Sequence, residues 1–122
     1  MNSAMNVVLL HGRLSRPAAR RVLPSGEDQA ELDVSVQRQG ERTETVNVVW
    51  PKAPASASTL DIGAEVVVVG RVRRRFFQAG GRTASRTEVV ADTVIAARHT
   101  KRVHAAIEAA FLVVEEATAM TA

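Results

Sequence analysis

The sequence contains no cysteine and no tyrosine, and its aromatic residues are three phenylalanines and one tryptophan. The absence of cysteine excludes disulfides and thiolate metal sites, and it fits a reducing cytoplasm. The early apolar run at residues 7–10 is too short for a signal peptide and has no cationic region before it. No apolar stretch approaches the length of a membrane span. We therefore expect a cytoplasmic protein with no membrane contact.

Length and charge indicate one domain whose basic residues are clustered. The 122 residues, 46% of them hydrophobic, suffice for one core. The net charge is only +3, so the charge of the whole molecule does not indicate a polyanion as partner. Most basic residues before residue 97 lie in two blocks, at residues 13–21 and 71–86, whereas acidic residues concentrate between residues 27 and 65. Binding of an anionic partner must therefore depend on these local blocks.

Alternating apolar and polar residues and turn signals predict an all-β domain as far as residue 97. Gly12 marks a bend or bulge in the long first strand, and Gly80-Gly81 supplies the positive φ of a hairpin loop. Residues 53–60 fit a loop or a short helical turn. Such a pattern is typical of a five-stranded OB-fold (Greek-key) barrel, although a small sandwich or an SH3-like barrel fits the pattern nearly as well. The five expected strands cover residues 6–15, 30–36, 43–50, 65–77 and 86–96.

A C-terminal α-helix is predicted after residue 97, because the apolar residues then recur at a helical period. Its apolar stripe either docks on the barrel of the same chain or forms a dimer or tetramer contact. The acidic pair at residues 115–116 opposes the helix dipole, so we expect residues 98–122 to form a helix with a frayed end. The stripe residues expected in an oligomer contact are Val103, Ile107 and Phe111.

Five segments resemble bacterial single-stranded DNA-binding proteins of the SSB family over residues 6–97. They read NVVLLHGRLS near the start, LPSG before the second strand, VVWPK at 48–52, IGAEVVVVGRVRRR at 62–75 and TEVVADTV at 87–94. The resemblance implies an OB-fold that binds single-stranded DNA without sequence preference, as a homo-oligomer, in replication, recombination or repair. It also implies a nucleoid-associated location and leaves residues 1–5 as a leader or a disordered N-terminus.

The stretch GRVRRRFFQAGGR, residues 70–82, is the strongest candidate for a binding surface. Residues alternate sides along a strand, so three arginines and Phe77 are expected on one side, while Phe76 is expected in the core. Arginines hold phosphates and stack on bases, and an aromatic ring accepts a base with about 1–3 kcal/mol per stack. The resemblance places stacking aromatics at Trp50 and Phe77. The predicted nucleic-acid contacts are Trp50, Phe77, Arg71, Arg73, Arg75, Arg13, Arg82 and Arg86.

Three departures from the SSB pattern leave alternatives open. Glu44 and Gly40 stand where the family often carries aromatics, and the chain ends in EEATAMTA instead of a disordered tail with an acidic tip that recruits replication enzymes. One alternative is an interaction or oligomerisation module whose barrel has lost most DNA binding. A second is a PriB-like primosomal protein. RNA also remains possible, because stacking and phosphate contacts do not read the 2′-hydroxyl.

Catalysis finds little support in the sequence. Of the three histidines, His11 lies in a strand, while His99 and His104 are five residues apart and so about 140° apart on a helix. That angle does not suit two ligands of one metal ion. We therefore expect no enzyme activity, no cofactor and no metal site.

Overall fold

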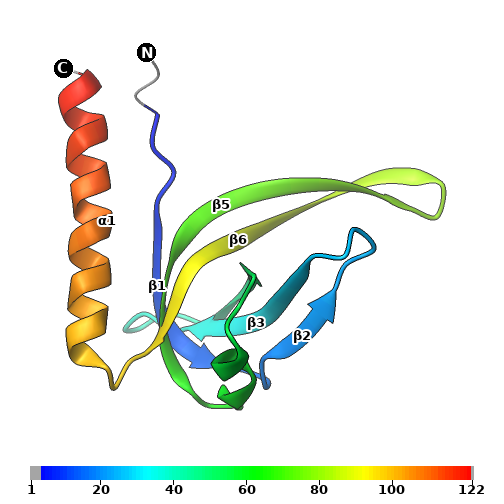
Figure 1. Cartoon of the computed structure of the whole chain (residues 1–122), viewed down its shortest axis with the longest axis horizontal. Helices are drawn as coiled ribbons and strands as arrows, with labels where there is room; N and C mark the ends of the chain where they lie inside the picture. The colour runs from blue at the N-terminus through cyan, green and yellow to red at the C-terminus, as the bar shows by residue number, and fades with distance from the viewer. Residues whose placement is uncertain (1–3, 122) are drawn as a thin grey trace.

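A computed structural model describes residues 4–121 of the chain, which form strands, one short 3-10 helix and one long α-helix (Figure 1). In chain order the elements are β1 (Val8–Leu14), β2 (Ala19–Val22), β3 (Asp28–Val36), β4 (Glu44–Pro51), η1 (Ala55–Thr59), β5 (Glu65–Ala79), β6 (Arg82–Ala96) and α1 (Thr100–Thr121).

The strands close into a ring. Their order in the sheet is β1-β5-β6-β4-β3-β2, and β1 also pairs with β3. This added pairing makes a five-stranded barrel of β1, β5, β6, β4 and β3, in which β4 and β6 run parallel and the other neighbours antiparallel. The predicted OB-fold with a C-terminal helix is thereby confirmed.

Strand β2 was not predicted from the sequence. It pairs only with β3, outside the ring, and all four of its residues are exposed. Because neither side of β2 is buried, its sequence ARRV carries no alternation of apolar and polar residues from which a strand could be recognised.

The barrel interior is filled by branched aliphatic side chains from every second position of the strands. Val34, Val66 and Val68 are fully buried there. Ring closure depends on Gly12, because a Cβ at this position would lie 2.3 Å from the carbonyl oxygen of Ser35 on β3. The glycine that predicted a bend in β1 therefore allows the backbones of β1 and β3 to approach closely.

The hairpin of β5 and β6 extends beyond the barrel (Figure 1). It turns at Gly80-Gly81, whose φ values of 57° and 77° confirm the predicted two-residue loop. Past a register shift between Val69 and Gly70, the two strands stay paired without further irregularity to Ala79 and Arg82. We call residues 71–87 the arm. None of its residues is buried, so each of its two faces is open to contact.

Helix α1 lies against the barrel through its first turns. Val103 and Ile107 line a groove with Leu9, Leu10 and Val67, among other residues of β1 and β5. The structure thus shows docking on the chain's own barrel at these two predicted positions. Within residues 4–121, no helix combines the length and the hydropathy needed to cross a membrane.

Helix α1 continues to Thr121 and includes the residues at which fraying is expected. Ala110 and Ala117 are buried, so packing reaches these later turns. An acidic residue near a helix C-terminus costs only about 0.3–1 kcal/mol, which packing can offset. The third predicted stripe residue, Phe111, is 56% exposed and lies beside the packed face.

The predicted leader at residues 1–5 lies mostly outside the described residues. Residues 4–7 precede β1 without regular secondary structure. Asn6 nevertheless ties this segment to β5, because its side-chain amide donates to the carbonyl of Val72 at 2.7 Å and its side-chain oxygen accepts from the Val72 amide at 2.9 Å.

Candidate nucleic-acid interface

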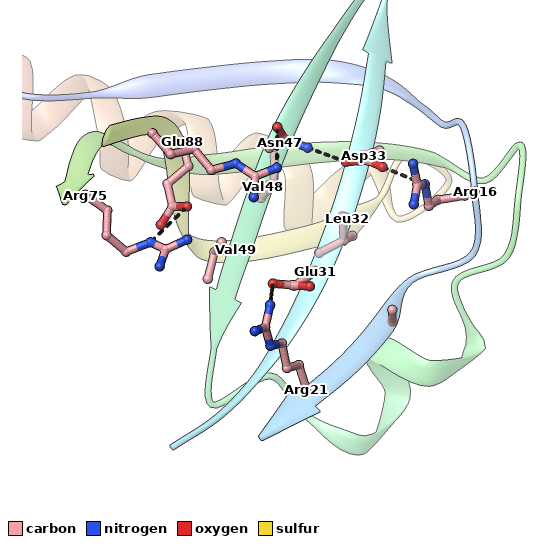
Figure 2. Close-up of a pocket in the computed structure, with 12 residues that line it drawn as sticks. Arg16, Arg21, Glu31, Leu32, Asp33, Asn47, Val48, Val49, Arg75 and Glu88 are labelled. Atoms are coloured by element: carbon pink, nitrogen blue, oxygen red, sulfur yellow. Dashed lines mark hydrogen bonds and ion pairs between the residues drawn. The ribbon is translucent and has the colours of Figure 1, made fainter. Parts of the chain in front are cut away.

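A cleft lies between the arm and the strands β2, β3 and β4. Its volume is about 190 Å³, and Figure 2 shows the side chains that line it. Register places Arg75 of β5 opposite Arg86 of β6, so these two arginines share the face of the arm that borders the cleft. The lining residues are Arg16, Ala19, Arg21, Glu31, Leu32, Asp33, Asn47, Val48, Val49, Arg75, Arg86 and Glu88.

Ion pairs hold three of the cleft arginines in place (Figure 2). Arg16 Nε lies 2.7 Å from Asp33 Oδ2, Arg21 Nη1 lies 3.6 Å from Glu31 Oε2, and Arg75 Nε lies 3.6 Å from Glu88 Oε1. A guanidinium has five N–H donors, so a pair with one carboxylate leaves others for a further anion. The carboxylates therefore orient the arginines along the cleft without using all their donors.

Arg86 differs from these arginines because no carboxylate in residues 4–121 pairs with it. Its Nη2 donates to the neutral Asn47 Oδ1 at 3.2 Å. Asn47 in turn donates through Nδ2 to Asp33 Oδ1 at 2.6 Å. This chain of hydrogen bonds fixes the orientation of the Asn47 amide, and it leaves the charge of Arg86 uncompensated at the cleft.

The three predicted phosphate-binding arginines of β5 share one face, as expected, and they are all ion-paired. Glu88, whose side chain is only 3% exposed, bonds Arg73 and also contacts Arg75. Arg71 Nη1 lies 3.8 Å from Asp92 Oδ1. A phosphate that binds these arginines must therefore share them with carboxylates, which favours Arg86 as the strongest anion contact of this face.

Phe77 continues the cleft face of the arm two residues beyond Arg75. The Cζ atom of Arg75 lies 5.2 Å from the centroid of the Phe77 ring, a cation–π distance. The ring is 36% exposed, so part of its surface is free to stack a base. The structure thus combines an aromatic ring and arginines on one face, as the strand alternation predicts.

Trp50 is buried, contrary to the expectation of an exposed stacking ring. It is only 8% exposed and belongs to the hydrophobic core. The apolar surface beside the indole comes from the segment after β4, which includes η1. Ala53 and Ala57 of this segment are buried in the same cluster as the indole. Trp50 is therefore a core residue here, and its ring does not line the cleft.

Phe76 shows the opposite error, since the sequence places it in the core and the structure leaves it 65% exposed. Phe76 lies on the opposite side of β5 from Phe77. Nearer the barrel, the same side of the hairpin carries Val89, which is buried in the core. By Phe76, however, the strands have left the barrel, so no core remains to cover the ring.

Arg13 lies apart from the cleft and lines a separate pocket with His11, Ser35 and Glu65, among other residues. Its Nη2 contacts Glu65 Oε1 at 3.2 Å, and His11 Nε2 lies 2.5 Å from Glu65 Oε2. The hydrogen bond from His11, with a further contribution from Arg13, lowers the pKa of Glu65. The structure therefore does not bring Arg13 together with the predicted arm residues.

The remaining predicted contact, Arg82, stands at the end of the arm, where β6 begins. It is exposed, and no ion pair within residues 4–121 involves it. Because it pairs with Ala79, it shares the cleft face with Phe77 and Arg86.

Apart from the basic block at residues 13–21, the sequence did not indicate the side of the cleft opposite the arm. Arg16, Arg21 and Asn47 come from the β1–β2 connection, β2 and β4, and only the closed barrel brings them near β5. The basic block at residues 13–21 was a usable signal for two of them. Another member of that block, Arg20, is structural, because it bonds Asp28 at 2.7 Å and the carbonyls of Ala53 and Pro54.

No group of three or more His, Cys, Asp or Glu side chains that could hold a metal ion occurs in the part of the chain that the structure describes. The cleft instead offers guanidinium groups and one amide beside three carboxylates, and the partly exposed ring of Phe77 follows on the same face of the arm. These groups suit recognition of phosphates and stacking on bases.

Comparison with known proteins agrees with this chemistry. Residues 5–97 match the Single-strand binding protein family. The chain is also similar to a single-stranded DNA-binding protein of Oceanobacillus iheyensis, with 37% identity over 99 residues. That match covers 74% of this chain and 62% of the relative's length. Residues 5–97, which match the family, contain the whole barrel and the arm and end before α1.

Proposed function

The chain belongs to the single-strand binding protein family, and we propose that it binds single-stranded DNA without sequence preference. Binding is non-enzymatic and serves replication, recombination or repair. The strand lies in the cleft and along the cleft face of the arm. Its backbone contacts arginines, and at least one base stacks on the arm.

The roles of the individual residues follow from their surroundings. Phe77 stacks a base on its exposed ring surface, at about 1–3 kcal/mol. Arg86 neutralises a phosphate, because it carries the uncompensated charge of the cleft, and Arg82 adds a contact at the end of the arm. Arg73 and Arg75 contribute as oriented donors that stay paired to Glu88. Every nucleotide has a phosphate and a base with an aromatic face, so these contacts do not depend on the DNA sequence.

The observation that carries the proposal is the shared face of Phe77, Arg75 and Arg86 at the border of the cleft. An aromatic ring beside arginines on a half-open surface is what an unpaired strand requires. A duplex hides its base faces and offers only phosphates and groove edges.

Competition tests the preference for a single strand. A fluorescently labelled oligo-dT of about 16 nucleotides, the upper end of the site size of one OB-fold, is bound to the protein and followed by anisotropy. Unlabelled single strands of mixed sequence should displace it at concentrations similar to those of unlabelled dT, while duplex of equal length should need at least about tenfold more. Equal displacement by duplex would show general polyanion binding and contradict the proposal. An RNA oligomer in the same assay separates DNA from RNA preference.

Helix α1 supports a second candidate function, contact with another protein or another copy of the chain. Phe111, Leu112 and Val113 are each more than half exposed, which is unusual for three consecutive apolar residues. Replacing Phe111 and Leu112 with serine should then lower the assembly state in sedimentation velocity. Unchanged sedimentation of a protein that assembles would remove this candidate.

A further inference from the structure

The arm has a second face that the proposed binding mode does not use. Strand alternation places Val72, Arg74 and Phe76 of β5 on this side, opposite Val89, Thr87 and Ser85 of β6. We call residues 72, 74, 76, 78, 83, 85 and 87 the reverse face. It turns away from the residues that line the cleft, none of which belongs to it.

The reverse face repeats the chemistry of the cleft face. The Cζ atom of Arg74 lies 5.4 Å from the centroid of the Phe76 ring, much as Arg75 lies over Phe77. Phe76 is 65% exposed against 36% for Phe77, so its ring offers more free surface for stacking. Each face of the arm therefore carries one arginine and phenylalanine pair, displaced from the other by a single residue.

The two faces differ in how their arginine charges are compensated. On the cleft face Glu88 and Asp92 compensate Arg71, Arg73 and Arg75. The reverse face contains no acidic residue, and Arg74 bonds there only to the neutral Ser85 Oγ, at 3.0 Å. Arg74 is thus the arginine of the RVRRR stretch without a carboxylate partner among residues 4–121. An exposed ring beside an uncompensated cation is complementary to a ligand that is both aromatic and anionic.

From these observations we propose that the reverse face of the arm, through Phe76 and Arg74, is a second stacking site for single-stranded nucleic acid. A strand long enough to leave the cleft passes around the arm and stacks a base on Phe76. This inference rests on the proposed function and extends it, because it assigns the same class of ligand to a separate surface. A second copy of the chain fits less well, since a twofold contact of this face with itself would bring like charges on Arg74 together.

Oligomers of two lengths distinguish the faces. One is oligo-dT of about 8 nucleotides, which lies within the site size of one OB-fold, and the other is oligo-dT of about 30, which exceeds it. The double variant with Phe76→Thr and Arg74→Gln should bind the short oligomer within about twofold of the unchanged protein. It should bind the long one at least about fivefold more weakly, the low end of the effect of losing one stack. Threonine keeps the β propensity of the arm, and Phe76 is too exposed for its removal to disturb a core.

Phe77→Thr is the matched control and should weaken both lengths. If the double variant binds the long oligomer as the unchanged protein does, while Phe77→Thr weakens both, the second site is refuted and the proposed function stands. If the unchanged protein binds neither oligomer, the proposed function itself fails. A double variant with normal DNA binding but altered sedimentation would assign the reverse face to protein contact instead.

A Phe76→Trp variant gives an independent readout of the same site. Its indole would be solvent-exposed, while the native Trp50 is buried and contributes a constant background. Long oligo-dT should quench the added emission, and short oligo-dT should leave it nearly unchanged. Absence of quenching with a bound long oligomer would overturn the proposal.

Discussion

Replacing Gly70 with alanine should lower the melting temperature by about 10 °C or more. A Cβ at this position would lie 2.1 Å from the carbonyl oxygen of Val90 and 2.9 Å from the Cα of Ala91. Both contacts are with backbone, so no side-chain rotation relieves them. Overpacking in a core typically costs about 1–3 kcal/mol, and a rigid backbone contact belongs at the upper end or above. For a domain of this size, 1 kcal/mol corresponds to roughly 4 °C. Thermal unfolding followed by circular dichroism measures the shift.

Gly26 provides the control for this substitution. It has a φ of +87°, and an added Cβ would meet nothing within 4 Å. Gly26→Ala should therefore cost only the strain of a left-handed residue, about 1–2 kcal/mol. A Gly70→Ala protein that melts at or above the temperature of the Gly26→Ala protein would show that β5 and β6 can separate at the register shift. The close packing at the base of the arm would then not be required for stability.

Phe77→Thr should weaken binding of oligo-dT by about 5- to 150-fold, the range that corresponds to 1–3 kcal/mol for one lost stack. The ring is only partly covered and lies outside the core cluster, so the variant should fold normally. Anisotropy titration at fixed salt measures the affinity. Phe111→Ala serves as the control, because it also removes an exposed phenyl ring, but from helix α1.

The salt dependence of the affinity distinguishes the loss of a stacking contact from the loss of an ionic contact. Loss of the Phe77 ring removes no ionic contact, so the slope of log K against log salt should stay unchanged. Arg86→Gln removes one cation from the cleft and should reduce the magnitude of that slope by about 0.7, the value for one phosphate on a single strand. If Phe77→Thr and Phe111→Ala affect affinity equally, the arm has no special part in binding.

Much of the fold follows from local sequence signals. Gly80-Gly81 between two alternating segments predicts the hairpin loop, and the change of period after residue 97 predicts the helix. The alternation that places Arg75 with Phe77 also holds, because no bulge interrupts β5 beyond Gly70. In each case the relevant partners lie close in sequence or are fixed by strand geometry.

The errors at Trp50 and Phe76 share one physical cause. Alternation says which residues lie on the same side of a strand, but not whether anything covers that side. Trp50 is covered by Ala53 and Ala57 of a segment whose fold was uncertain from the sequence. Phe76 is uncovered because the arm continues past the end of the barrel. Both outcomes depend on where the strands sit in the closed ring.

The ion pairs of the arm could not be predicted from the sequence either. Register sets Glu88 opposite Arg73, and the same carboxylate reaches Arg75. The sequence shows these residues as a basic run followed by an isolated acid, with no sign that the acid is buried between the arginines. We therefore expect phosphate contacts at Arg86 and Arg82 rather than at the ion-paired arginines, and at Arg74 on the reverse face.

Nuclear magnetic resonance on the 15N-labelled protein tests most directly that a single strand lies on the cleft face of the arm. Amide and arginine Nε–Hε signals are followed while oligo-dT of about 8 nucleotides, which fits the site size of one OB-fold, is added. We expect the Nε–Hε signals of Arg75 and Arg86 and the amide signals around Phe77 to shift with increasing oligomer and to return when salt is raised. Shifts confined to helix α1, or no shifts with a folded protein at low salt, would contradict this expectation.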